Sequence, residues 1–439
     1  MKYKNIIFIL LFPICLANGQ ALNKVTITIN DAVNLALEKN ADIKVALLEV
    51  EKSEEKVREA KSGLFPKLDI TGQYQRYLEK PVIFLPPGSP LGTTLKIGAD
   101  NSYNATAALT IPLLSFTLYE GISIANEGKA IATENLRTVK NKVASEVKKA
   151  FYLSLLLRET KDVMNQSLKN AEDNFNNIKR LNEGGTLSDY DVLRAEVQVD
   201  NLRPTVLQSE NNYNLSLEAL KVAIGLDANS EIDIKGELNK SDNGKLNNDE
   251  IISNVVLNNP QLALLDLQKS LYEKNISLET SAYYPTLSGF GNYQYQAQAN
   301  DFKFSDYNWV NTFVVGFQVQ VPVFNGFKTD SRITQAEIGL NQINEQKRNY
   351  TESIKTQALS ILYRIEQANK RIEGQDKTVR QATEGYEIAK RRLENNLATQ
   401  LELNDAELAL RQSKLNRLQA IYDYKVAEAE LENVLGILK

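Results

Sequence analysis

Three carboxylates stand beside two predicted turns between helices, and they have the clearest chemical potential in the chain. Asp191 follows Ser188 by three positions, and Glu402 follows Thr399 by three positions. This spacing is typical of a capping box at the start of a helix. Asp405 lies one helical turn beyond Glu402 on the same face, and an arginine stands at its counterpart in the other half of the chain. Capping explains the first two carboxylates, whereas Asp405 needs another role.

The composition removes most enzymatic chemistry. The chain has 439 residues, no histidine and a single cysteine, Cys15. A chain without histidine has no imidazole base and no Ser-His-Asp triad, and it lacks the commonest ligand of zinc and haem. These classes of enzyme and metal site are excluded, although many enzymes work without histidine. We expect no catalysis, no cofactor and no metal site. The balance of 51 Lys and Arg against 55 Asp and Glu is mildly acidic, which argues against a nucleic-acid partner.

The first 19 residues read as an export signal. Lys2 and Lys4 precede a short apolar run, and Ala17-Asn18-Gly19 supplies the small residues of a cleavage site. We expect the mature protein to begin near Gln20, although the sequence leaves the cleavage position open. Cys15 would leave with the signal, and the residues before it lack the small side chain that a lipoprotein signal places there.

The rest of the chain consists of two similar sequence repeats. At an offset of 219 residues Asn40 meets Asn259, and at an offset of 211 Gly225 meets Gly436. Matches of this kind extend over nearly 200 residues, which indicates a tandem duplication. We predict a first repeat over residues 20–225, a polar linker over 226–249 and a second repeat over 250–439.

Each repeat is predicted to run helix, strand, loop, strand, very long helix, turn, helix. The opening helices span about 31–62 and 250–282. The remaining elements of the first repeat are strands at about 66–77 and 103–112, a long helix over 115–182 and a helix over 187–224. Those of the second repeat are strands at about 285–297 and 309–322, a long helix over 326–395 and a helix over 400–438.

The four predicted strands alternate between apolar and uncharged polar residues, and aromatic residues gather near their ends. This pattern favours strands of a transmembrane barrel, with a soluble antiparallel sheet as the alternative. In the barrel interpretation the lipid-facing residues are Leu68, Ile70, Tyr74, Leu109, Ile111, Tyr293, Phe313, Phe317 and Val319. Four strands cannot close a membrane barrel, so the chain would have to oligomerise as a dimer, trimer or tetramer.

The two long helices set the scale of the molecule. Each has about 70 residues without a proline, which is roughly 100 Å of helix. Heptad positions such as Ile365, Ile372 and Val379 predict a left-handed supercoil, and an ordinary two-stranded coiled coil is the simplest alternative. Two stacked shorter helices match one long helix in length. A long helical tube attached to a barrel indicates a conduit across a compartment.

In the order, duplication and spacing of its elements, the sequence resembles the TolC-like outer membrane efflux proteins, also called outer membrane factors. The resemblance rests on Asn259-Pro260, on the passage from Ser281 to Pro285 and on the passage from Val321 to Gly326. It also rests on the turn from Gly185 to Ala195, which recurs from Asn396 to Ala406. It implies a mainly α fold with a small transmembrane β part. Tandem-duplicated long coiled helices would form a periplasmic α-barrel, and a homotrimer would form a 12-stranded β-barrel in outer-membrane lipid.

The same resemblance implies the exit duct of a tripartite efflux or type I secretion system. Such a duct passively conducts substrates from an inner-membrane pump, to which a periplasmic adaptor (membrane fusion) protein links it. A periplasmic coiled-coil structural or adaptor protein is the competing interpretation. A secreted hydrolase finds no supporting group of residues. The transported substrate and the class of pump cannot be read from the sequence.

The resemblance also assigns roles near the two turns. It implies that Glu402 and Asp405 line the narrow periplasmic entrance, where threefold symmetry would gather six carboxylates, and that Asp191 is a gate acid. Leu393 and Ala398 stand where some family members carry a Tyr and an Arg that bond neighbouring helices. How this channel closes is therefore open.

The turns themselves are the candidate adaptor-docking tips. Gly185 and Asn396 occupy matching positions where a tight turn favours a positive φ. Because the turns are predicted to lie farthest from the strands, a periplasmic partner would meet them end-on. The predicted docking residues are Gly184, Gly185, Thr186, Asn395, Asn396 and Leu397.

Overall fold

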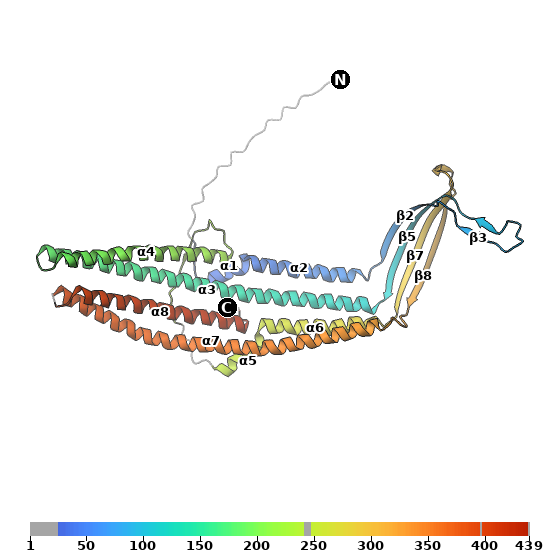
Figure 1. Ribbon diagram of the computed structural model, residues 1–439. Helices are drawn as coiled ribbons and strands as arrows, with labels where there is room; N and C mark the ends of the chain where they lie inside the picture. The colour runs from blue at the N-terminus through green and yellow to red at the C-terminus, as the bar shows by residue number, and fades with distance from the viewer. Residues whose placement is uncertain (1–24, 241–246, 396, 438–439) are drawn as a thin grey trace, which may run out of the picture. The chain divides into compact units, whose positions relative to one another are not determined.

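The computed structural model describes residues 25–240, 247–395 and 397–437 (Figure 1). Several sequence-based predictions fall wholly or partly outside the described residues. These are the signal peptide with Cys15, residues 20–24 of the first repeat, residues 241–246 of the predicted linker, Asn396 at the second turn, and residues 438–439 at the end of the second repeat.

Four long helices form two hairpins. The first joins α3 (Phe116–Glu183) to α4 (Asp189–Ile224), and the second joins α7 (Lys328–Glu394) to α8 (Gln400–Leu435). Their ends lie within three residues of the predicted ends, since extended heptad patterns without prolines specify long helices well. Among the described helices, none carries a run of residues long and apolar enough to cross a membrane.

The helix that opens each repeat is broken in two, and the prediction of a single helix was wrong in both places. The first gives α1 (Ile29–Lys39) and α2 (Ala41–Ser62), and the second gives α5 (Asn248–Asn258) and α6 (Pro260–Ser281). In the second repeat the Asn259 side chain caps α6. Its amide oxygen accepts from the backbone N–H of Gln261 at 3.0 Å and from that of Leu262 at 3.1 Å. Pro260 then occupies the first turn of α6, where its missing N–H costs nothing.

Each break forms a joint with the end of the helix that closes the same repeat. Asn40 Nδ2 donates to the carbonyl of Ala223 at 2.9 Å, and Asn259 Nδ2 donates to the carbonyl of Val434 at 2.9 Å. In both repeats a glycine stands two residues after the carbonyl that accepts this bond. Gly225 has φ +83° and a Cβ there would stand 2.7 Å from the Lys39 carbonyl oxygen. The equivalent glycine of the second repeat, Gly436, has φ +68°. A Cβ there would stand 2.6 Å from the carbonyl oxygen of Asn258, at the α5–α6 break.

The main sheet is antiparallel, in the order β2-β5-β7-β8 (Figure 1). Its strands are β2 (Lys67–Arg76), β5 (Asn101–Leu114), β7 (Thr286–Ala299) and β8 (Val310–Gln320). Within the described chain β2 and β8 are therefore edge strands, each hydrogen-bonded to a neighbour on one side only.

The strand register brings the nine predicted lipid-facing residues to one face of this sheet. Leu68 pairs with Leu109, Ile70 lies in a row with Tyr293 and Phe313, and Ile111 lies in a row with Phe317. On the opposite face a Cβ on Gly316 would meet the Phe290 ring at 2.9 Å, so the glycine makes room for the aromatic side chain. The period-two pattern thus placed all nine residues on a common face, and contact of this face with lipid stays a prediction.

Two small sheets were not predicted. The strands β1 (Val25–Ile27) and β6 (Ile232–Ile234) pair in parallel, and β3 (Val82–Phe84) and β4 (Thr94–Lys96) form a hairpin between β2 and β5. The Arg158 guanidinium donates to the carbonyl of Ile234 at 3.0 Å. The predicted linker is thus partly ordered. Strands of three residues are too short to give a periodic sequence signal.

Two compact units divide the chain along different lines from the sequence repeats. Of the described residues, one unit takes 25–41, 142–240 and those within Ser360–Asn433, and the other takes Asp42–Asn141, Asn247–Leu359 and 434–437. Each unit therefore contains segments of both repeats. Neither repeat therefore corresponds to one of the two units.

Candidate functional site

The turn of the first hairpin is a Schellman motif. Gly185 has φ +75°, its N–H donates to the carbonyl of Asn182 at 2.8 Å, and the N–H of Thr186 donates to the carbonyl of Leu181 at 2.9 Å. These two bonds and a left-handed glycine define the motif. The Asn182 side chain then holds the far side of the turn by donating to the carbonyl of Leu187 at 2.9 Å. The positive φ predicted at Gly185 is confirmed.

The turn of the second hairpin is closed by the equivalent long bond. The N–H of Leu397 donates to the carbonyl of Arg392 at 2.8 Å, five residues back, as Thr186 does in the first hairpin. The Arg392 guanidinium returns a bond to the carbonyl of Leu397 at 2.8 Å, and Asn395 Nδ2 donates to the carbonyl of Arg391 at 2.7 Å. The Leu397 side chain stays exposed at this turn.

The three predicted carboxylates differ in the hydrogen bonds and ion pairs that they form with nearby residues. Asp191 closes a capping box with Ser188, accepting from its hydroxyl at 2.7 Å and from its N–H at 3.2 Å. Glu402 is half-exposed, and its carboxylate lies 3.5 Å from Nη1 of Arg392. Asp405 is exposed and forms no ion pair among the residues that the structure describes. Asp405 therefore carries the least compensated negative charge of the three.

The buried Gln400 links the two hairpins and was missed by sequence reasoning. Only 6% of this residue is exposed. The amide orientation that satisfies both of its polar groups directs the nitrogen to the carbonyl of Asp191 at 3.2 Å and the oxygen to the N–H of Ala195 at 3.1 Å. The first residue of α8 thereby bonds to the first turns of α4. A glutamine in a helical pattern gives no signal of such a contact.

The two positions that bear Tyr and Arg in some family members lie inside the second hairpin. Leu393 is 5% exposed and packs with Tyr386, Leu403 and Leu410, and Ala398 packs against this group. These side chains form the apolar seam between α7 and α8. Leu393 and Ala398 thus contribute to the core of one hairpin and offer no hydrogen-bonding group to another.

A ladder of ion pairs follows the same hairpin. Arg364 pairs with Glu430 and Arg371 pairs with Asp423, seven residues apart on both helices. Exposed pairs contribute little energy each, so the ladder mainly fixes the register of α7 on α8. At Glu430 burial acts to raise the pKa, but hydrogen bonds from Lys149 of α3 and from Arg364 outweigh it and lower the pKa below its usual range.

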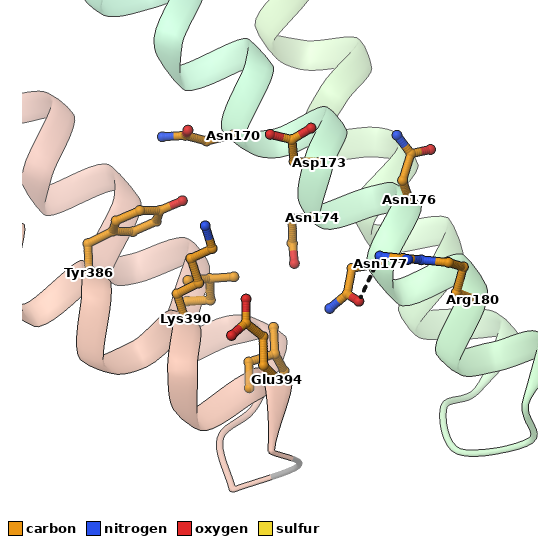
Figure 2. A pocket seen from close by; sticks show the side chains of 11 residues that line it. Asn170, Asp173, Asn174, Asn176, Asn177, Arg180, Tyr386, Lys390 and Glu394 are labelled. Carbon is orange, nitrogen blue, oxygen red and sulfur yellow. Dashed lines mark hydrogen bonds between the residues drawn. The ribbon is translucent and has the colours of Figure 1, made fainter.

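A polar groove of about 310 Å³ lies between α3 and α7 near these turns (Figure 2). Figure 2 shows Tyr386 and Lys390 of α7 and Asp173 and Asn174 of α3 directed into the same space. Burial, and then the nearby Glu407 carboxylate, raise the pKa of Tyr386 to about 12, so its phenol stays neutral and can donate a hydrogen bond. The full lining is Asn170, Asp173, Asn174, Asn176, Asn177, Arg180, Tyr386, Lys390, Leu393, Glu394 and Leu403.

The chemistry of this region is hydrogen bonding and charge. The groove lining combines amides with two acidic and two basic side chains, and none of these groups is paired with a nucleophile and base in the manner of a hydrolase. No cluster of three or more potential metal ligands occurs within residues 25–240, 247–395 and 397–437. The region can bind a polar chain or ions, and it can hold two hairpins together.

Comparison with known proteins agrees with this architecture. TolC of Vibrio cholerae is 22% identical over 293 residues, which cover 66% of this chain and 67% of that protein. The probable efflux pump outer membrane protein TtgC of Pseudomonas putida is 20% identical over 412 residues, covering 92% and 82% of the two chains. The Campylobacter jejuni CmeC outer membrane channel has the same fold, with a TM-score of 0.74 at 16% identity over 93% of this chain and 85% of that one.

The family described as outer membrane efflux protein matches residues 32–226 and 251–437. These two segments correspond to the two repeats found by self-comparison, and together they make up most of the chain. The chain belongs to the outer membrane efflux protein family.

Proposed function

We propose that this protein is the outer-membrane exit duct of a tripartite efflux or type I secretion system. It conducts substrates passively from an inner-membrane pump through the periplasm and the outer membrane. The carrying observation is the sheet of four strands, apolar along one face, with an unpaired edge at β2 and another at β8. Family membership supports the same function.

The two edges call for further copies of the chain. An open sheet would leave backbone N–H and C=O groups unpaired in lipid, which is costly. Three copies joined from β8 to the next β2 give a closed barrel of twelve strands, within the range of outer-membrane barrels. The strand directions allow this closure, because β2 and β8 run in opposite directions in the sheet and would meet antiparallel. A homotrimer with lipid around its apolar face follows as the proposed assembly.

The turns of the two hairpins are the proposed periplasmic end of the duct. Their docking residues would be Gly184, Gly185, Thr186, Asn395, Asn396 and Leu397, which would meet a periplasmic adaptor protein. At the entrance Asp405 would dominate the field, because the charge of Glu402 is partly offset by Arg392 at 3.5 Å. Asp191 would act mainly through its cap on α4. Closure would depend on contacts between hairpins such as that of Gln400.

Membrane fractionation combined with a transport assay tests this function. We expect the full-length protein in outer membranes as a trimer that resists SDS until heated. Deletion of the gene should raise the intracellular accumulation of an effluxed dye, and the intact gene should reverse the change. A soluble monomer in the periplasm would instead favour the structural or adaptor interpretation. A trimer that forms no ion-conducting channel in planar bilayers would refute the duct.

A further inference from the structure

The segment between β2 and β5 exposes an unusual amount of apolar surface. It contains the β3–β4 hairpin, and its exposed large side chains include Leu78 at 92% and Phe84 at 81%. Ile83, Leu95 and Ile97 of the hairpin are also exposed. Single exposed apolar residues are ordinary on protein surfaces, but a contiguous group on a projecting element marks a binding surface.

Three of the apolar side chains, those of Ile83, Leu95 and Ile97, share one face of the hairpin. Ile83 pairs directly with Leu95, and Ile97 follows on the same side, where its N–H donates to the carbonyl of Pro81 at 3.0 Å. The other face combines Phe84 with Thr94, and Val82 with Lys96. An isolated two-stranded hairpin is marginally stable in water and gains stability when an apolar face is covered.

The hairpin is held in shape before anything covers it. Its tip has two successive turns, closed by bonds from Ser89 N–H to the Pro86 carbonyl at 3.2 Å and from Gly92 N–H to the Ser89 carbonyl at 3.1 Å. Its base is fixed by the ion pair of Lys80 with Asp100 at 3.0 Å. An element that is ordered in advance loses less entropy on binding than a flexible loop does.

We infer that this face is a subunit clasp that docks on the next copy of the chain. The inference rests on the proposed trimer. The hairpin leaves directly from the end of β2, which is the edge strand that barrel closure places against β8 of the next copy. Because those strands would be antiparallel, the end of β2 at Arg76 and the start of β8 at Val310 would lie at the same rim of the barrel. The hairpin therefore continues the β2–β8 interface beyond the strands.

The segment of the next copy that leads into β8 has the matching chemistry. Its Phe304 and Tyr307 rings pack on Tyr103 of their own chain, with ring centres 5.3 and 5.6 Å apart. Phe302 and Val310 remain more than half exposed and are available to another subunit.

Photo-crosslinking in outer membranes tests the clasp. The photoreactive residue p-benzoylphenylalanine replaces Ile83 on the proposed face in the full-length chain, and the same residue at Leu68 on the lipid-facing side of the sheet is the control. We expect Ile83→p-benzoylphenylalanine to yield a covalent dimer that survives heating in SDS, with the crosslink in residues 301–310 of the second chain. The control should crosslink to lipid.

The alternatives give different products. If position 83 crosslinks to lipid or to a different protein, or does not crosslink at all, in a preparation whose trimer is intact, the clasp is overturned and the duct still stands. Absence of any trimer would overturn both. As a second measurement, the Ile83→Ser/Leu95→Ser double variant should lower the temperature at which the SDS-resistant trimer dissociates while the ion conductance of the assembled channel is unchanged. An unaltered dissociation temperature would also contradict the clasp.

Discussion

Substitution of Gly225 by alanine gives a sharp test of the joint between α4 and the α1–α2 break. Two costs act together. At φ +83° an alanine loses about 1 kcal/mol relative to glycine. The added Cβ would also stand 2.7 Å from the oxygen and 2.8 Å from the carbon of the Lys39 carbonyl. Because these are backbone atoms, they cannot rotate away, and overpacking of this kind costs about 1–3 kcal/mol more.

Gly185 is a matched control within the same chain. Its φ is +75°, but a Cβ there would have no heavy atom within 4 Å. Gly185→Ala should therefore cost only the conformational part, about 1 kcal/mol. Gly225→Ala should cost about 3 kcal/mol in all, and Gly436→Ala should behave like it, since its Cβ would meet the carbonyl oxygen of Asn258 at 2.6 Å.

Hydrogen exchange measured by mass spectrometry on the detergent-purified protein reads this difference locally. A loss of 3 kcal/mol is on the order of a 100-fold faster exchange in the peptides that cover the α1–α2 break and the end of α4, against about fivefold for the control at its own turn. Thermal unfolding followed by circular dichroism should rank the variants in the same order. If Gly225→Ala and Gly185→Ala proved equal, the close approach would have no energetic weight and the reasoning would be wrong.

Four further predictions concern the hairpin turns and the contacts along α7 and α8. Asp405→Asn should reduce the cation selectivity of single channels more than Glu402→Gln does, because an arginine partly offsets Glu402; equal reversal potentials would contradict this. Leu403→Ala should destabilise the second hairpin by about 2–5 kcal/mol, seen as faster amide exchange at the turn. Gln400→Leu should raise the open probability in planar bilayers, because it removes both bonds to α4. The lowered pKa of Glu430 contributes stability that is present above its ordinary pKa of 4.5 and is lost as the pH falls below it, so Glu430→Gln should flatten the acid limb of thermal stability.

The parts of the fold that repeat over many residues could be predicted from the sequence. The long helices follow from heptads without prolines, and the strand faces follow from alternation over ten or more residues. The cap formed by Ser188 and Asp191 and the left-handed Gly185 were also readable, because each depends on residues within one turn. Features of this kind can be predicted because the residues that determine them are close together in the sequence.

Features that depend on distant contacts could not be predicted. The break at Asn40 has no proline or glycine beside it, and it is completed by a hydrogen bond to Ala223, 183 residues away. The same holds for Gln400, whose partners lie on another hairpin. The positions of Leu393 and Ala398 were known, but only the packing shows that they belong to the seam between α7 and α8. In each case tertiary contacts decide a role that the residue type leaves open.

The paired joints also bear on how such a chain could arise. The bond from Asn40 to Ala223 lies wholly within the first repeat, and the bond from Asn259 to Val434 lies wholly within the second. Each half therefore holds every atom that its own joint requires. A half-length ancestor could have made this contact unaided, and fusing two such genes end to end would have altered no bond at either joint.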